Sequence, residues 1–93
     1  MITAIVLLDT ETSQIPEVAT EVAGVPGVSE VYSVTGEVDL IAIVRVKEHD
    51  ELAEVIANRI SKVPGVLRTQ TYTAFQAYST HDLDSAFALG LDD

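Results

Sequence analysis

In this chain of 93 residues, some segments are rich in apolar, β-branched residues, and others repeat apolar residues every three or four positions. The order of these two kinds of segment predicts the secondary structure. Four runs rich in Val, Ile, Leu and Thr are predicted to be strands: residues 2–8, 28–35, 39–46 and 66–78. Two other segments repeat apolar residues every three or four positions, which is typical of a helix with one buried face. The chain is therefore predicted to alternate strands with two helices.

Each helical segment has a recognisable apolar side and start. The apolar side of the first consists of Ile15, Val18, Ala19, Val22 and Ala23. Thr12 or Ser13 is expected to cap this helix, and Pro16 is compatible only with its first turn. The apolar side of the second consists of Leu52, Val55, Ile56 and Ile60. His49 or Asp50 is expected near its cap.

The tetrapeptide Val-Pro-Gly-Val occurs twice, at 25–28 and at 63–66, each time between a helical segment and a strand. Pro26 and Pro64 are expected to end the helices, because proline cannot continue the hydrogen-bond ladder. The glycine after each proline then supplies the turn into the following strand. The repeat marks two βαβ-like halves.

The predicted order is strand, helix, strand, strand, helix, strand, which is the α+β ferredoxin-like βαββαβ arrangement. Its sheet is antiparallel, with both helices on one face. We expect one domain over residues 1–93, with a core at about 2–78 and a C-terminal extension at 79–93. A third helical segment is expected after Thr80. Its apolar side consists of Leu83, Phe87 and Leu91.

The strand at 39–46 is apolar on both sides, with Leu40, Ala42, Val44 and Val46 on one and Ile41 and Ile43 on the other. Such a strand is expected to be buried on both sides, whereas the two helices cover only one. The other side is predicted to meet a second copy of the chain, sheet against sheet. This gives a homodimer of the dimeric α/β barrel type, from which higher assemblies can form.

Composition excludes several classes of partner and site. Fifteen acidic and five basic residues give a net charge of −10, and the basic residues form no cluster. Nucleic acids and anionic membranes attract cationic surfaces, so neither is an expected partner. The absence of cysteine excludes disulfides and thiolate sites, and no cofactor is expected. Residues 1–8 are too short for a signal peptide or a membrane span, so we expect a cytoplasmic protein.

The join between the two central strands, Thr35-Gly36-Glu37-Val38-Asp39, combines a glycine with a carboxylate three positions later. Gly36 can adopt a positive φ without steric cost and exposes its backbone groups. Together with the carboxylate of Asp39, these groups suit a small zwitterionic ligand. A plain hairpin turn with no ligand explains the same residues, so both interpretations stay open.

Other candidate residues carry weaker signals. Thr69, Thr71 and Thr73 project to the same side of the last strand, where they either reflect β propensity or line a polar pocket at a subunit interface. The His–Asp neighbours at 49–50 and 81–82 fall at predicted helix starts, where capping is their expected role. No catalytic motif is present, and we do not expect an enzyme.

Three pieces, in order and spacing, resemble the effector-binding domain of Lrp/AsnC (feast/famine) transcription regulators. They are Pro26-Gly27-Val28, Thr35-Gly36-Glu37-Val38-Asp39-Leu40 and Pro64-Gly65-Val66-Leu67-Arg68-Thr69-Gln70-Thr71. The resemblance covers about residues 2–78. It implies barrel-like dimers that assemble into octamers or similar rings.

The resemblance also implies that a small effector such as an amino acid binds between dimers at the loop of residues 35–39. Gly36 would offer backbone groups and Asp39 would accept from the ligand's ammonium, while Thr35, Thr69 and Thr71 are weaker candidates for the lining. Because the first predicted strand starts at Ile2, the chain resembles stand-alone members of the family that have no helix-turn-helix. Such a member would sense a metabolite or modulate full-length Lrp/AsnC regulators.

Two other functions stay open. A structural oligomerisation module needs no ligand at the glycine turn. Small enzymes also use dimeric α/β barrels, but they need a pocket that usually holds His, Tyr or Trp. This chain has no tryptophan, and its two histidines fall at helix starts.

Overall fold

The computed structural model describes residues 1–80, and its elements follow the predicted order. The strands are β1 (Ile2–Thr10), β2 (Val28–Ser33), β3 (Leu40–Val46) and β4 (Val66–Thr73). The helices are α1 (Ile15–Ala23) and α2 (His49–Ile56), and two short 3-10 turns are η1 (Thr12–Gln14) and η2 (Ile60–Lys62). The helical segment predicted beyond Thr80 lies outside the described residues.

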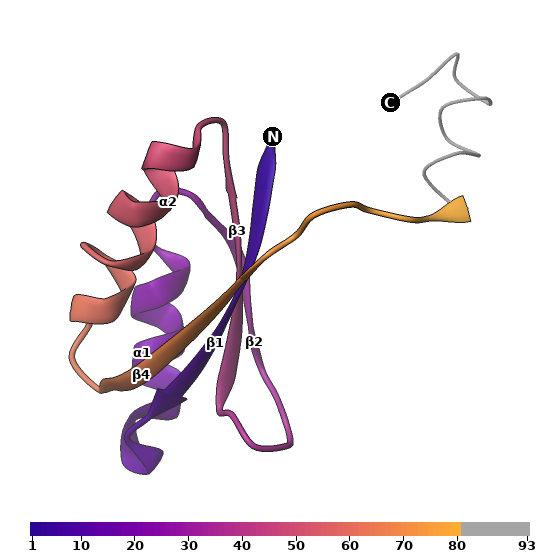
Figure 1. Cartoon of the computed structure of the whole chain (residues 1–93). Coiled ribbons are helices and arrows are strands. Elements are labelled where there is room, and N and C mark those ends of the chain that lie inside the picture. The colour runs from indigo at the N-terminus through magenta and orange to yellow at the C-terminus, as the bar shows by residue number, and fades with distance from the viewer. Residues whose placement is uncertain (81–93) are drawn as a thin grey trace.

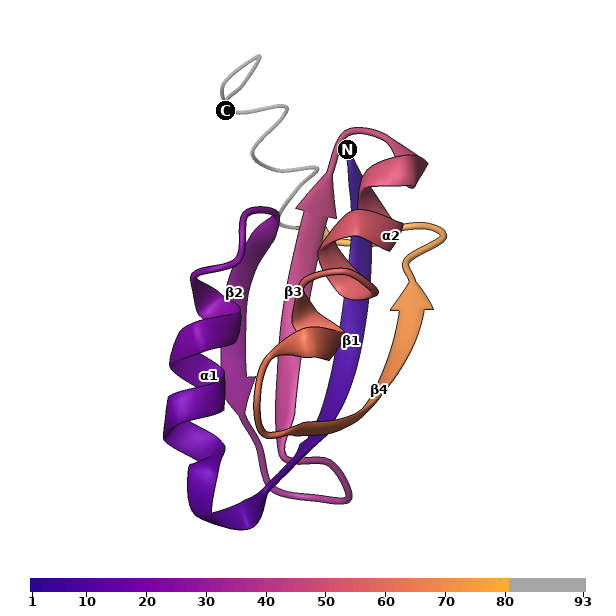
Figure 2. The ribbon, with the colours of Figure 1, turned by 90° about the vertical axis from the view of Figure 1, so that its left-hand side faces the viewer.

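The four strands form one sheet in the order β2-β3-β1-β4, and all neighbouring strands are antiparallel. Seen along the sheet, α1 and α2 both lie on the same side (Figure 1). Seen from that side, the two helices stand side by side in front of the strands (Figure 2). The ferredoxin-like α+β prediction is therefore confirmed.

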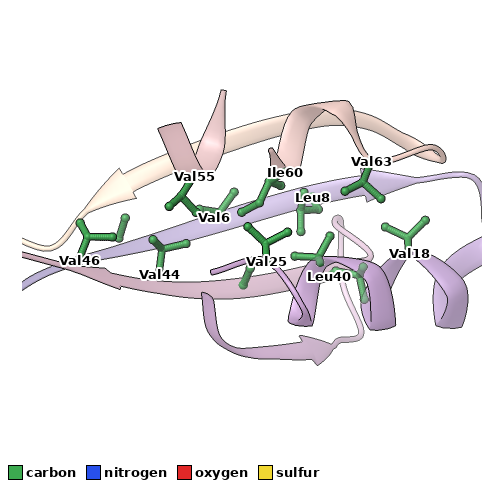
Figure 3. Packing of buried hydrophobic residues seen from close by; sticks show 13 residues of the cluster. Val6, Leu8, Val18, Val25, Leu40, Val44, Val46, Val55, Ile60 and Val63 are labelled. Atoms are coloured by element: carbon green, nitrogen blue, oxygen red, sulfur yellow. The ribbon is translucent and has the colours of Figure 1, made fainter. Parts of the chain in front are cut away.

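The core lies between the two helices and the helix side of the sheet (Figure 3). It is dominated by valine, which packs well on a pleated surface but fills less volume than leucine. On β3 the buried residues alternate with half-buried or exposed ones, as the two-residue strand period requires. Its fully buried members are Leu40, Ala42 and Val44.

The helix starts differ in detail from the prediction. The cap of α1 is Gln14 rather than Thr12 or Ser13, because residues 12–14 already form the turn η1 that leads into the helix. Pro16 lies in the first turn of α1, as predicted. The cap of α2 is Glu48, just before the predicted residues.

The cap of α2 is completed by Glu51. Its Oε1 accepts hydrogen bonds from the backbone N–H groups of Lys47 (2.9 Å) and Glu48 (3.1 Å). These bonds satisfy two donors at the start of the helix, as a capping box does.

Three elements end earlier than predicted, and the first is β2, which ends at Ser33 rather than at residue 35. The helix α2 ends at Ile56, yet Ile60 is fully buried because the turn η2 directs it into the core. The strand β4 ends at Thr73, which pairs with Ala4 near the start of β1. Beyond one further bond, from the N–H of Ala74, the described residues offer no strand for β4 to continue against.

Each Val-Pro-Gly-Val segment forms a tight turn. The N–H of Val28 donates to the carbonyl of Val25 (3.0 Å), and the N–H of Val66 donates to that of Val63 (3.1 Å). Proline at the second position and a glycine with φ of 99° or 98° at the third are what a type II turn requires.

The two turn glycines pack tightly under the helix of the opposite half. A Cβ on Gly27 would lie 2.7 Å from Cγ2 of Val55 in α2, and one on Gly65 would lie 2.6 Å from Cγ2 of Val18 in α1. Each half of the chain thus holds the helix of the other in place.

Alanine at Gly27 or Gly65 is expected to destabilise the fold more than alanine at Gly36. All three glycines have a positive φ, which costs another residue about 1–3 kcal/mol. At Gly27 and Gly65 the new Cβ also overpacks a valine, which adds about 1–3 kcal/mol. Urea unfolding of the three variants measures the difference. Equal losses of stability at all three positions would contradict this packing explanation.

Candidate functional site

The loop of residues 35–39 lies at the end of the sheet where β1 finishes. Its start is exposed, whereas Val38 and Asp39 are half-buried. The N–H of Asp39 donates to the carbonyl of Leu8 (3.0 Å), and its carbonyl accepts from the N–H of Val34 (3.2 Å). The loop is thereby fixed to both the hairpin and the neighbouring strand.

The Asp39 side chain also has a partner in the chain. Its Oδ2 accepts a hydrogen bond from the backbone N–H of Thr10 (2.9 Å), the buried last residue of β1. Within residues 1–80, its second oxygen, Oδ1, accepts no hydrogen bond. The carboxylate is therefore held in one orientation and keeps one oxygen for another donor.

Gly36 differs from the two turn glycines. It has φ of 126°, but a Cβ placed on it would meet no atom of the described chain within 4 Å. Its glycine identity thus follows from the backbone conformation alone, and the space beside it is open. A ligand or a neighbouring subunit can approach the backbone there.

Thr69, Thr71 and Thr73, termed the threonine row, project from the same side of β4, as predicted. That side faces the helices. Thr69, Thr71 and Thr73 pair with core residues of β1, and Thr69 lies opposite Leu8. The row therefore lies on the helix side of the sheet, and its place at a subunit interface stays a prediction. Thr69 and Asp39 both neighbour Leu8, so they share one end of the sheet, whereas Thr71 lies further along β4.

The sheet side that no helix of residues 1–80 covers is termed the open face. Its apolar centre consists of four half-buried residues, Ile5, Leu7, Ile41 and Ile43. Around this centre lies a polar rim. It consists of Glu30 and Tyr32 on β2, Arg68, Gln70 and Tyr72 on β4, and Arg45 and Asp9 near the ends of the central strands β3 and β1. An apolar centre with a polar rim is typical of a protein interface.

Hydrogen bonds order this rim at both edges. Glu30 accepts from the Tyr32 hydroxyl (2.9 Å) and from Nη1 of Arg45 (3.0 Å). These two bonds lower the pKa of Glu30 below its ordinary 4.5, and the bond to Glu30 raises the pKa of Tyr32 above 10.0. At the other edge, Nε of Arg68 donates to Oδ2 of Asp9 (3.1 Å).

A cavity that the sequence did not predict lies beside α2. It has a volume of about 490 Å³ and lies at the end of the sheet opposite the loop of residues 35–39, between β3 and α2. Lys47 and Arg59 both line it, although they are separated along the sequence. Basic residues from two distant segments thus lie around one cavity. No local sequence motif predicts that they come together.

Two negative findings apply to residues 1–80. None of their helices is long and apolar enough to cross a membrane. In the same part of the chain, no three His, Asp or Glu side chains are grouped closely enough to hold a metal ion.

Residues 3–83 match the profile of a protein family described as the Lrp/AsnC ligand binding domain. The chain is similar to TTHA0845 from Thermus thermophilus, with 44% identity and a TM-score of 0.81 over 85% of this chain and 99% of that one. It is also 37% identical, over 63% of its length, to the uncharacterized HTH-type transcriptional regulator PH1916 of Pyrococcus horikoshii. The chain spans only 39% of that regulator.

The regulator NMB0573 from Neisseria meningitidis, whose structure is a complex with L-Met, shares the fold. The likeness has a TM-score of 0.73 over 85% of this chain and 54% of that one, at 17% identity.

Two substitutions of Asp39 separate its structural role from its charge. Asp39→Asn keeps an oxygen that can accept from the Thr10 N–H, so it is expected to change the free energy of unfolding by less than about 0.5 kcal/mol. Asp39→Ala leaves that N–H unpaired and is expected to cost about 1–3 kcal/mol. Urea unfolding measures both. If the alanine variant is as stable as wild type, the bond to Thr10 does not hold the loop.

Proposed function

Because this chain belongs to the Lrp/AsnC ligand binding domain family, we propose that it binds a small amino-acid-like effector at the Thr35–Asp39 loop. We further propose that it self-associates through the open face and works in the cytoplasm with transcription regulators. The family supports the general role, and the geometry of the loop supports the position of the site.

The observation that carries the proposal is the orientation of Asp39 beside Gly36. The carboxylate is half-buried and fixed by Thr10, with Oδ1 left for a donor such as a ligand ammonium. The backbone at Gly36 is open to a second group of the same ligand. A fixed acceptor beside open backbone is the pre-organised arrangement that lowers the entropic cost of binding.

The relatives and the charge of the chain support the choice of ligand and partners. The L-Met complex of the Neisseria meningitidis regulator is an amino-acid complex of a protein of this fold. The Pyrococcus horikoshii relative is a helix-turn-helix regulator. A net charge of −10 disfavours contact with DNA phosphates, so the proposed role is to sense an effector and act on such regulators.

The open face supports the proposed self-association. Its apolar centre is half-buried in one copy, and a second copy that covers it would remove that surface from water. The hydrogen-bonded rim lies around this centre and would surround the interface, as polar rims do in stable dimers. We propose the face-to-face α/β-barrel dimer as the basic unit, with rings of dimers as the larger assembly.

A structural module without a ligand is the second candidate. The bond between Asp39 and Thr10 favours it, because that bond gives Asp39 a reason to be present in the absence of any effector. In that case the loop only closes the end of the sheet.

A stability screen against the twenty amino acids distinguishes the two candidates. An effector at about 100 times its Kd is expected to add about 2.7 kcal/mol to the free energy of unfolding. Asp39→Asn is expected to remove this gain while leaving the unliganded stability nearly unchanged. Glu37→Gln, the same charge change at an exposed position of the loop, is the control and should keep the gain. A gain that survives Asp39→Asn places the ligand elsewhere, and no gain with any amino acid favours the structural module.

Charge placed on the open face is expected to break the assembly. Ile43→Lys puts an ammonium in the apolar centre opposite Ile5, and it should reduce the mass in sedimentation velocity to that of one chain. The variant should still fold, because Ile43 lies outside the helix-side core. Ala53→Lys on the exposed side of α2 is the control and should leave the mass unchanged. An unaltered mass in Ile43→Lys would exclude the open face as the interface.

A further inference from the structure

The two ends of the sheet are built alike. Where β1 leads into α1, the N–H of Glu11 donates to the carbonyl of Gly65 (2.9 Å). Near the end of β3, which leads into α2, the N–H of Arg45 donates to the carbonyl of Gly27 (2.9 Å). Each Val-Pro-Gly-Val turn therefore closes one corner between a strand and a helix.

The two corners differ in what covers them. At the first, the β2–β3 loop lies over the end of β1, and Asp39 bonds to Leu8 and Thr10. At the second, no loop within residues 1–80 takes the corresponding place, and the cavity of about 490 Å³ lies there. This volume falls within the roughly 300–1,000 Å³ of ordinary small-molecule sites.

The floor of this cavity is apolar and firmly held. It includes Val46 and Val55, which are only 7% and 6% exposed, together with Pro26 and Gly27. Gly27 already packs against Val55, since a Cβ there would lie 2.7 Å from its Cγ2. In Figure 3, Val46 and Val55 lie at one end of the core and Val18 at the other. The floor is thus shaped before any ligand arrives.

The acidic residues that line the cavity are bonded to their own helix. Oε1 of Glu51 accepts from the N–H groups at the start of α2, and Oε1 of Glu54 accepts from Nδ2 of Asn58 (3.0 Å). By contrast, Lys47 and Arg59 form no ion pair with any residue of the described chain. Arg45 also lines the cavity but is paired with Glu30, so Lys47 and Arg59 are the lining cations without an ion-pair partner within residues 1–80.

We infer that this cavity binds a small carboxylic acid with a short apolar chain. The chain lies on the valine floor, and the carboxylate accepts hydrogen bonds from Lys47 and Arg59. Guanidinium and ammonium groups are the usual partners of carboxylates, and apolar contact supplies the remaining affinity. This site is separate from the proposed effector loop and does not depend on it.

Methyl NMR of the full chain, titrated with 3-methylbutanoate, tests the inference. Saturating shifts are expected for the methyl groups of Val46 and Val55, with little change at Val18. Arg59→Gln and Lys47→Gln are each expected to raise the Kd about three- to tenfold, in line with hydrogen bonds to charged groups at a part-exposed site. The neutral 3-methylbutanamide should bind more weakly than the acid.

Matched controls separate this site from general charge attraction and from the loop. Lys62→Gln makes the same charge change close to Arg59 but at a residue that does not line the cavity, so it should leave the Kd within about twofold, because no hydrogen bond to the carboxylate is removed. Asp39→Asn should leave the titration unchanged, even if the loop binds no effector. The inference is overturned if Lys62→Gln weakens binding as much as Arg59→Gln does. It is equally overturned if the amide binds as tightly as the acid, or if no saturating shift occurs at Val46 and Val55.

Discussion

The close packing of each Val-Pro-Gly-Val turn under the helix of the opposite half is the contact on which the rest of the structure depends. Gly27 lies against Val55 and Gly65 against Val18, with no room for a side chain at either glycine. These two contacts set the distance between the helices and the sheet. They also close the two ends of the core, where the proposed effector loop and the valine-floored cavity lie.

Within residues 1–80, helices cover only one side of the sheet, and this has a second consequence. The helices bury one side of the sheet, and the opposite side keeps an apolar centre within a hydrogen-bonded rim. A chain of this size has a modest core, so burial of the open face by a second copy would add stability as well as define an assembly. The proposed effector loop lies at the end of this same sheet, where assembly and ligand binding can influence each other.

The two ends of the sheet differ in the polar groups that they present. At one end, the β2–β3 loop covers the corner and fixes the carboxylate of Asp39 against the last residue of β1. At the other, the corner stays uncovered within residues 1–80, and a valine-floored cavity lies beside two cations that have no ion-pair partner in that part of the chain. The first end offers a fixed acceptor suited to an ammonium, and the second offers donors suited to a carboxylate.

The order of the elements, the one-sided helices and the position of the glycine loop followed from the sequence, because period, proline and glycine are local signals. Register and end points did not follow, because they depend on the partner strand: β4 stops where β1 begins, and the side that Thr69 faces depends on its pairing with Leu8. The anchoring of Asp39 by Thr10 and the placement of Lys47 and Arg59 around one cavity likewise join segments that are distant in the sequence. The sequence by itself thus determined the fold class and the candidate loop. Only the tertiary structure decided which groups around each site are already bonded and which are left for a ligand.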